Sequence, residues 1–388
     1  MLRWNFPHDS KECCNFVTPP IPMSAPDLDE SDVQAVLEVL RTGQLALGPR
    51  SVEFERRMAE YIGVKHAVAV SSGTAALHLI VQALALGPGD EVLVPSFTFA
   101  ASVNVILYVG ATPVFVDIEP ETYNLDPADL ERKVTPRTRA IMVVDVFGHP
   151  AGWVAVERVA AKHGLTVIDD SCEALGAEYQ GRKIGRFGDA AAFAFYPNKQ
   201  MTTGEGGIVV TNRDDVATMA RSLRNQGRNE MGAWLEHQRL GYNYRMDELS
   251  AALGVSQLVR LPTFLEKRDR VARNYAERLC DLADQVRPPV VKPNVRASWF
   301  VYVVTLAEGL HRDQVMAALA AEGIPSRGYF SPVHRQPYIL ERFGTLHGDL
   351  PVTEAAAERT VALPFHNNLS EEQVERVVAA LARAVASV

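Results

Sequence analysis

Short apolar runs alternate with helix-like segments through most of this chain, and this alternation restricts the fold more than any other feature. HAVAV is followed by TAALHLIVQAL, EVLVP by FAASVNVILYV, and RAIMVVDVF by VAVERVAAKHG. Apolar strands that are each followed by a helix are typical of a mostly parallel sheet with helices on both faces. We therefore expect an α/β fold for the larger part of the chain.

The pattern changes in residues 248–278, where a long helical sequence contains Pro262. Proline lacks a backbone N–H and breaks or kinks a helix, so we interpret Pro262 as a hinge. On this basis residues 23–258 form a large domain and residues 259–388 a small C-terminal domain. The strand-like SWFVYVVTL, the helical DQVMAALAAEG and a helix over 370–388 predict an α+β small domain.

Bulk composition argues against several classes of protein. Asp and Glu number 47 against 39 Lys and Arg, a net charge of −8, which disfavours nucleic acid as the main partner. No apolar run reaches the ~18 residues that span a membrane, and residues 1–22, an expected irregular tail, lack the apolar segment of a signal peptide. The four cysteines have neither the spacing of a disulfide framework nor that of a zinc site. We therefore expect a cytoplasmic protein without a metal ion.

A single lysine, Lys199, stands between the apolar run AAAFAFY and a turn that carries Gly204, Gly206 and Gly207. These glycines lack the G-x-G-x-x-G spacing and lead into the strand-like GIVVT, so they form neither a dinucleotide-binding loop nor a Walker loop. Lys199 is either a solvated residue beside a tight turn or a functional amine at a strand end. The ends of the other strands favour the second interpretation.

Polar and aromatic groups follow three other predicted strands. Residues 71–74, Ser-Ser-Gly-Thr, follow HAVAV and open a helix, which is typical both of plain helix caps and of phosphate sites. Phe99 follows EVLVP, either as a packing residue or as a stacking ring, and Asp169 and Asp170 end the strand that begins LTVI. Ligands of open α/β sheets bind at the carboxyl ends of the strands, so we expect these groups and Lys199 to surround one site.

This combination of groups suits pyridoxal 5′-phosphate (PLP). The lysine amine forms a Schiff base with the cofactor aldehyde, and a carboxylate keeps the pyridine nitrogen protonated so that the ring accepts electrons. A helix start binds the phosphate, and an aromatic side chain holds the plane of the ring. Each group has a structural explanation of its own, but PLP chemistry requires all four together.

Four stretches carry a resemblance to a known family: SSGTAALHL, VIDDSCEALGAEYQGRKIGRFGD, FYPNKQMTTGEGG and GYNYRMDELSAALG. They resemble the DegT/DnrJ sugar aminotransferases, a branch of the fold-type I PLP-dependent transferases, and the similarity extends from Ile21 to the C-terminus. The resemblance implies a large domain with a mostly parallel sheet, a small C-terminal domain, and a homodimer with shared active sites. It also implies PLP, with pyridoxamine 5′-phosphate (PMP) as its intermediate form. The expected substrates are an amino-acid donor, usually L-glutamate, and the keto group of a nucleotide-linked sugar.

The resemblance also implies roles for the residues at the strand ends. Lys199 matches the lysine that forms the Schiff base and then moves a proton, and Asp170 matches the acid on the pyridine nitrogen. Glu173 matches a polar position beside the ring 3′-oxygen. The remaining cofactor contacts that it implies are Ser72, Gly73 and Thr74 at the phosphate, Phe99 on the ring, and Asn243 reaching from the neighbouring subunit.

Ala194 departs from the family pattern, because relatives commonly place a phosphate-binding serine five residues before the lysine. Phosphate binding must then depend more on residues 72–74 and on Asn243. The candidates for substrate contacts are Arg228, Arg245, Arg327 and His334. The histidine is equally well explained as a structural or turn residue.

Three alternative functions are compatible with parts of this sequence. Sugar dehydratases of the same family replace the lysine with histidine, so Lys199 argues against that activity. A regulatory protein that keeps the fold without turnover is disfavoured by the intact Lys199 and Asp170. An aminotransferase that acts on a keto-cyclitol or another non-nucleotide ketone stays open. The acceptor's base, sugar and aminated carbon stay open as well, and so does the pathway: surface polysaccharide, cell-wall glycan or secondary metabolite.

Overall fold

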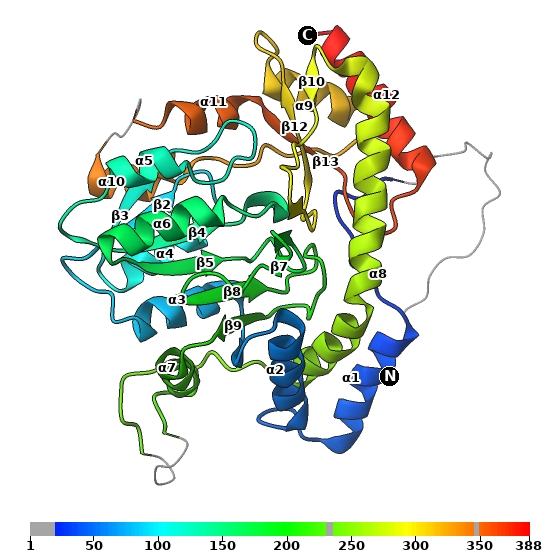
Figure 1. The fold of residues 1–388 in the computed structure, drawn as a ribbon. Coiled ribbons are helices and arrows are strands. Elements are labelled where there is room, and N and C mark those ends of the chain that lie inside the picture. Colours follow the sequence, from blue (N-terminus) through cyan, green and yellow to red (C-terminus); the bar gives the residue numbers. More distant parts are fainter. Residues whose placement is uncertain (1–19, 230–235, 345–348) are drawn as a thin grey trace.

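The computed structural model describes residues 20–229, 236–344 and 349–388, so most of the expected N-terminal tail lies outside the described residues. Its centre is a seven-stranded sheet in the order β1-β9-β8-β5-β4-β2-β3 (Figure 1). The strands are β1 (His66–Val70), β2 (Glu91–Pro95), β3 (Thr112–Val116), β4 (Thr138–Val144), β5 (Thr166–Asp170), β8 (Ala190–Ala194) and β9 (Gly207–Thr211). Every neighbouring pair is parallel except the two that involve β9, which confirms the mostly parallel sheet.

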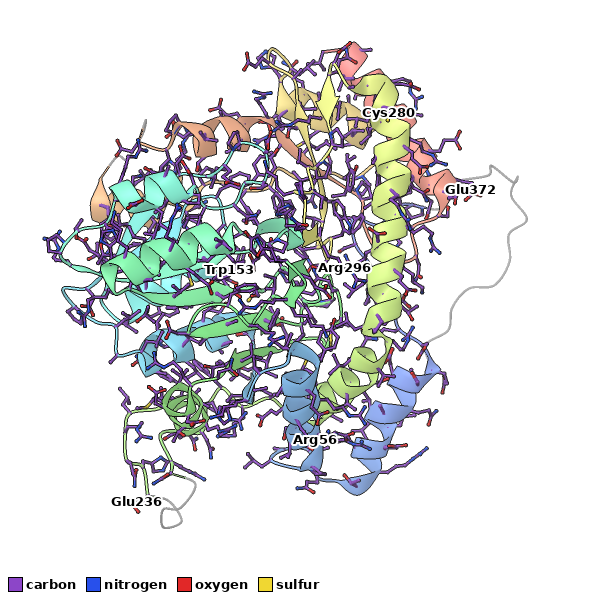
Figure 2. All side chains as sticks on the ribbon, viewed as in Figure 1. Arg56, Trp153, Glu236, Cys280, Arg296 and Glu372 are labelled. Carbon is purple, nitrogen blue, oxygen red and sulfur yellow. The ribbon has the colours of Figure 1, made fainter. Side chains whose placement is uncertain are left out.

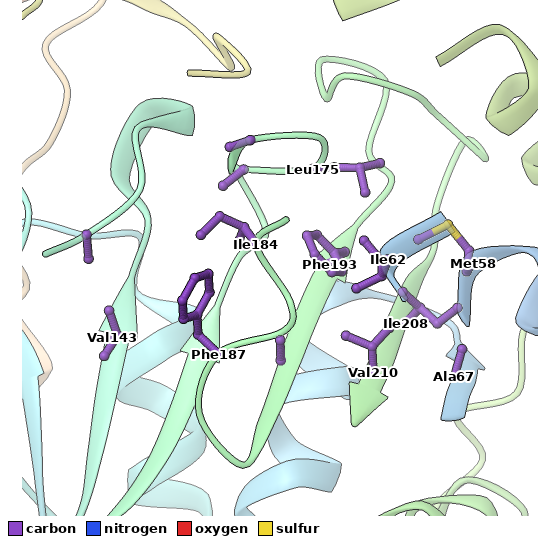
Figure 3. Close-up of a cluster of buried hydrophobic side chains, with 14 of the residues drawn as sticks. Met58, Ile62, Ala67, Val143, Leu175, Ile184, Phe187, Phe193, Ile208 and Val210 are labelled. Carbon is purple, nitrogen blue, oxygen red and sulfur yellow. The ribbon is translucent and has the colours of Figure 1, made fainter. Parts of the chain in front are cut away.

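Helices cover both faces of this sheet because side chains alternate along each strand. Val68 and Val70 of β1 join one buried apolar cluster, and Ala67 and Ala69 join the cluster on the opposite face. The first face is covered by α3 (Gly73–Ala83), α4 (Ala101–Tyr108) and α7 (Asp214–Arg224). The second is covered by α2 (Pro49–Ile62), α6 (Trp153–His163) and the start of α8 (Glu248–Leu279). Figure 3 shows part of this second cluster, in which Met58 and Ile62 of α2 lie over the β8 and β9 strands.

The long helix α8 connects the two halves of the molecule, and the break expected at Pro262 does not occur (Figure 1). Proline removes one backbone N–H from the helix, but burial on both sides of it holds the helix together. Residues before Pro262 pack under the large sheet, and residues after it pack with α12 (Glu371–Ala386). The predicted domain boundary between residues 258 and 259 therefore falls inside one continuous helix and stays a prediction.

A second sheet, antiparallel, forms the core of the C-terminal half. It contains β10 (Val286–Arg287), β12 (Tyr302–Leu306) and β13 (Thr360–Leu363). α9 (Arg312–Ala321), α12 and the end of α8 pack against it, which agrees with the expected α+β arrangement. A third small sheet, β11 (Val295–Arg296), β6 (Glu178–Tyr179) and β7 (Arg182–Lys183), joins segments of both halves. The remaining elements are α1 (Glu30–Thr42), α5 (Pro127–Arg132), α10 (Pro337–Phe343), α11 (Pro351–Arg359) and the 3-10 turns η1 (Val146–Gly148), η2 (Cys280–Leu282) and η3 (Val333–Arg335).

The described part of the chain has no helix that is long and apolar enough to cross a membrane. Within the same residues, no three His, Cys, Asp or Glu side chains are grouped so that they would hold a metal ion. Cys172 and Cys280 are free thiols.

Candidate active site

The carboxyl ends of the central strands surround a cavity of about 330 Å³. Its walls come from the segments that follow β1 and β2, from the end of β5, and from the turn after β8. The structure thereby brings together these predicted residues: Ser72, Gly73, Thr74, Phe99, Asp170, Glu173 and Lys199. The other predicted residues, Asn243, Arg228, Arg245, Arg327 and His334, do not line this cavity of their own chain.

The N-terminus of α3 forms one end of the cavity. Ser72 is the N-cap, and its Oγ accepts a hydrogen bond from the Ala75 N–H at 3.1 Å. The first N–H groups of a helix have no acceptor within the helix, so those of Gly73 and Thr74 are available to an anion. A Cβ atom on Gly73 would lie 2.7 Å from the Cβ of Ala194, so only glycine allows this approach of helix and strand. The geometry suits a phosphate group.

Asp170 presents a carboxylate to the same cavity. Its Oδ2 accepts a hydrogen bond from the Ser102 hydroxyl at 2.7 Å, and its Oδ1 accepts one from the Cys172 N–H at 3.2 Å. The side chain is 6% exposed, so its orientation is set by these two donors. A buried carboxylate that faces a cavity without a paired cation suits a protonated ring nitrogen.

Two further carboxyl groups lie together behind Asp170, on the other face of the sheet. Asp169 and Asp145 are fully buried, and no N–H or O–H of the described residues reaches Oδ1 of Asp169 or Oδ2 of Asp145. The two side chains interact closely enough to share a hydrogen bond. Two carboxyl groups can share a hydrogen bond only when a proton lies between them. Asp145 also accepts from the Ala151 N–H at 2.6 Å and from the indole of Trp153, whose position Figure 2 labels.

Burial without a cation explains the protonation of this pair. It raises the pKa of Asp145 to about 7, and it raises the pKa of Asp169 well above its usual value, helped by the charge of Asp145. Neither carboxyl forms an ion pair with any described residue. The charge of Asp170, the next residue of the strand, raises the pKa of both carboxyls further. The pair therefore retains a proton at neutral pH.

Lys199 lies in a tight turn after β8. Its N–H donates to the Tyr196 carbonyl at 2.9 Å, and its Nζ lies 3.8 Å from the centre of the Phe300 ring. Within the described residues, no carboxylate forms an ion pair with Nζ. The amine is thus held beside an aromatic ring at the cavity wall, where it can react.

Glu173 closes the side of the cavity next to Lys199. Burial raises the pKa of this carboxyl, and the Lys199 charge partly offsets the rise. Its Oε2 accepts from the Phe147 N–H at 2.8 Å, and Phe147 has a φ of 59°, a conformation that is uncommon outside glycine. Backbone strain of this kind persists where surrounding contacts fix it, and here the Glu173 contact is one of them.

These residues fit PLP. The start of α3 offers N–H groups to a phosphate, Asp170 offers a carboxylate to a ring nitrogen, and Lys199 offers an amine to an aldehyde. Phe99 is 66% exposed at the cavity wall, so its ring has a face free for stacking. Asn198, beside the lysine, has a buried Oδ1 that lacks a hydrogen-bond partner within the residues that the structure describes.

Asn243 is exposed and lies between two tyrosines that point into the protein. The rings of Tyr242 and Tyr244 stack with their centres 5.0 Å apart. The Gln82 amide of α3 donates to the Tyr242 hydroxyl at 2.9 Å, and the His78 Nδ1 lies 3.1 Å from the Tyr244 hydroxyl. The loop is therefore fixed by its tyrosines, and the exposed asparagine between them does not line its own chain's cavity.

Arg228 and Arg245 line a separate cavity of about 120 Å³, together with Arg221 and Arg224. Arg245 donates to the Asn225 amide oxygen at 2.9 Å, and the buried Nε of Arg228 has no hydrogen-bond partner among the described residues. The two arginines thus lie together, near the base of the loop that carries Asn243.

His334 and Arg327 lie elsewhere. His334 is fully buried; its Nδ1 lies 2.6 Å from the Ser96 hydroxyl and its Nε2 lies 3.2 Å from Glu354. Burial lowers the pKa of this histidine. Arg327 donates to the Ser326 carbonyl and pairs through its backbone with Ala362. The structural interpretation of His334 is the one that these contacts support.

Sequence reasoning missed two residues of the lysine's surroundings. Phe300 provides the ring under Lys199 Nζ, and Arg268 of α8 donates to the Lys199 carbonyl at 2.9 Å. Phe300 lies in the stretch SWFVYVV, whose apolar pattern indicated only a strand. No local pattern distinguishes Arg268 from the other arginines of its helix.

A mostly parallel sheet with this lysine, carboxylate and helix start at its strand ends defines a PLP-dependent aminotransferase. The chain belongs to the DegT/DnrJ/EryC1/StrS aminotransferase family, whose model matches residues 26–382. It is 44% identical over 367 residues to the GDP-perosamine synthase of Caulobacter vibrioides, which covers 94% of this chain and 98% of that protein. It is 37% identical to the spore coat polysaccharide biosynthesis protein SpsC of Bacillus subtilis, over 93% of this chain and 96% of that one.

Solved structures agree with this assignment. DesV of S. venezuelae, in complex with a ketimine intermediate, is 36% identical with a TM-score of 0.89, over 95% of this chain and 99% of that chain. PseC of Helicobacter pylori, an aminotransferase of pseudoaminic acid biosynthesis, is 31% identical with a TM-score of 0.91, over 95% of this chain and 100% of that chain. The predicted fold class, cofactor and enzyme class are therefore confirmed.

Proposed function

We propose that this enzyme transfers an amino group from an amino acid, with L-glutamate as the donor, to the keto group of a nucleotide-linked sugar. The observation that carries the proposal is the 44% identity to a GDP-perosamine synthase along 98% of that protein. A relative named for spore coat polysaccharide biosynthesis supports a role in glycan assembly. We place the reaction in the cytoplasm, in agreement with the free thiols.

The residues that line the cavity have different roles in this reaction. Bound PLP supplies an aldehyde that captures amino groups and a ring that accepts electrons. Lys199 binds the cofactor through Nζ and, once released by the amino substrate, moves a proton on and off the reacting carbon. Asp170 holds the proton on the ring nitrogen, and Phe99 covers the ring. The start of α3 orients the phosphate with the N–H groups of Gly73 and Thr74.

A homodimer forms part of this proposal. Asn243 is exposed and does not line the cavity of its own chain, so its amide is free to reach the phosphate in a partner's cavity. Ala194 offers no donor at the strand end, which leaves more of the phosphate binding to Asn243. Arg228 and Arg245 lie near the same loop and are proposed to contact anionic groups of the substrates.

A screen of ketone acceptors tests the proposed function. The enzyme is loaded with PMP, mixed with keto-sugar nucleotides of different bases, and followed by the return of PLP absorbance. We expect conversion with a nucleotide-linked keto-sugar, with guanosine diphosphate sugars tested first because of the relative named above. A free keto-cyclitol is the comparison substrate. Conversion of the cyclitol alone would overturn the nucleotide-sugar assignment and leave the aminotransferase class intact.

A further inference from the structure

Arg268 of α8 is a buried guanidinium without a carboxylate partner in the described part of the chain. Its side chain is 2% exposed, and it forms no ion pair with any described acid. Burial lowers its pKa to about 10, so the group stays positively charged at neutral pH. A charge that is buried without a counter-ion must be stabilised by hydrogen bonds, and the structure shows where these are made.

Four main-chain carbonyl groups accept the hydrogen bonds of Arg268. One terminal nitrogen donates to the carbonyls of Trp299 at 2.8 Å and Phe300 at 3.2 Å. The other donates to the carbonyls of Lys199 at 2.9 Å and Asn198 at 3.4 Å. The two nitrogens of one planar group thus bind two different segments of the chain, which a point charge on a flexible stem does not reproduce.

The two segments that Arg268 joins meet at the reactive amine. One is the turn that carries Lys199, and the other enters β12 and carries Phe300, whose ring lies 3.8 Å from Lys199 Nζ. A second link runs beside the first, because the Gln200 amide donates to the Ser298 hydroxyl at 2.9 Å. The Phe300 N–H is itself fixed by the Phe147 carbonyl at 3.0 Å. Phe300 therefore has a fixed position relative to the cavity, and Arg268 fixes Lys199 relative to Phe300.

We propose that Arg268 is the positioning residue of the reactive lysine: it ties the Lys199 main chain to Phe300 and thereby holds Nζ at the cavity wall. This inference rests on the proposed role of Lys199. Proton transfer by an amine requires a narrow range of positions, and a displacement of ~1 Å costs on the order of a hundred-fold in rate. A purely structural role, in which Arg268 only attaches α8 to the core, predicts a loss of stability without a change at Nζ.

Three variants separate these two roles. Arg268→Lys keeps a positive charge but cannot bridge both pairs of carbonyls. Arg260→Lys is the matched control, because Arg260 lies on the same helix and pairs with Asp27, Asp29 and Asp32, away from the lysine turn. Phe300→Leu leaves its main-chain carbonyl in place for Arg268 and removes the ring from Nζ.

Each variant is studied with bound PLP by four measurements. The pH midpoint of the cofactor's visible absorbance reports the environment of Nζ. Borohydride labelling followed by peptide mass spectrometry reports attachment to Lys199. The rate of the half-reaction with L-glutamate reports proton transfer, and thermal unfolding reports stability.

We expect Arg268→Lys to shift the absorbance midpoint and to slow the half-reaction by roughly ten- to a hundred-fold. Phe300→Leu should shift the midpoint in the same direction. The double variant, Arg268→Lys with Phe300→Leu, should shift the midpoint by less than the sum of the two single shifts. Arg260→Lys should lower the unfolding temperature while its midpoint and rate stay within about twofold of the parent enzyme.

Several results would overturn the inference. If Arg268→Lys unfolds at a lower temperature with an unchanged midpoint and rate, the residue is structural only. If Arg268→Lys does not fold, the Phe300→Leu variant tests the inference by itself. An unchanged absorbance midpoint in that variant would show that the Phe300 ring does not influence Nζ. Labelling of the parent enzyme at a lysine other than Lys199 would instead refute the role proposed for Lys199 in the function itself. The two failures are therefore distinguishable.

Discussion

Two consecutive aspartates of β5 lie on opposite faces of one strand and have opposite surroundings. Asp170 faces the cavity, accepts from Ser102 and Cys172, and forms no ion pair with a described residue. Asp169 faces the apolar core and lies against a second carboxyl, Asp145, with which it can share a hydrogen bond. The strand pleat thus makes one carboxylate available to a ligand and forces the other to hold a proton. Residue type alone would not separate the two.

The largest effect is expected from removing the amine on the cavity face. Lys199→Ala should fold normally and lose turnover by on the order of a thousand-fold or more, because both cofactor attachment and proton transfer use Nζ. Borohydride treatment of the parent enzyme should fix the cofactor on the peptide that contains Lys199. Recovery of the label on Lys183 or Lys162 would contradict the assignment.

The two aspartates themselves provide the next test. Asp170→Asn should keep the cofactor but lose turnover by roughly a hundred-fold, because a neutral amide stabilises a protonated ring nitrogen poorly. Asp169→Asn should lose only a few-fold, since its amide N–H can replace the shared proton in the hydrogen bond to Asp145. Steady-state rates and cofactor content measure both. A greater loss of turnover in Asp169→Asn than in Asp170→Asn would mean that the roles of the two aspartates are exchanged.

Asn243 tests the part of the cavity that is proposed to come from the partner subunit. Loss of one hydrogen bond to a charged phosphate costs about 1.5–3 kcal/mol, so Asn243→Ala should weaken PLP binding by roughly ten- to a hundred-fold. Titration of the apoenzyme with PLP measures this affinity. Asn212→Ala, at an exposed asparagine whose side chain accepts from the Lys65 N–H, is the matched control. Equal affinities of the two variants would remove Asn243 from the site.

The effect expected on the core face concerns the dependence of stability on pH rather than turnover or cofactor affinity. The pKa of Asp145 is raised to about 7 by burial, whereas the same carboxyl titrates near ~3.9 in an unfolded chain. Between these values the folded protein holds a proton that the unfolded chain has lost. The stabilisation is therefore complete at low pH and is lost as the pH rises toward 7, by about 1.4 kcal/mol for each pH unit.

Denaturant unfolding of the apoenzyme at several pH values tests this slope. The double variant Asp145→Asn with Asp169→Asn should lack this contribution, so its unfolding free energy should depend less on pH than that of the parent enzyme. Parallel pH curves for the two proteins would mean that the pair shares no proton.

The cavity was predictable because its signals are local in the sequence. Each strand end carries its own residue, such as Ser72 after β1 or Lys199 after β8, and a parallel sheet brings those ends together. The same logic predicted the sheet itself, because apolar strands that alternate with helices leave few other folds. The family resemblance added the cofactor and the substrate class.

Contacts between distant segments were not predictable in the same way. Arg268 meets Lys199 across 69 positions of the chain, and the pairing of Asp145 with Asp169 depends on strand register. His334 matched a position near the sugar, yet its side chain is satisfied in the core by Ser96 and Glu354. Pro262 does not end α8, because apolar packing on both sides of it keeps the helix continuous.

The two ends of α3 have a genetic consequence. The helix starts at the phosphate end of its own cavity and, at His78 and Gln82, holds the tyrosines that flank Asn243. If that asparagine serves the partner, two defective alleles can restore one another. In a dimer of a Lys199→Ala chain and an Asn243→Ala chain, one cavity carries both lesions and the other carries neither. A cell that expresses both alleles should therefore regain activity that each allele alone lacks.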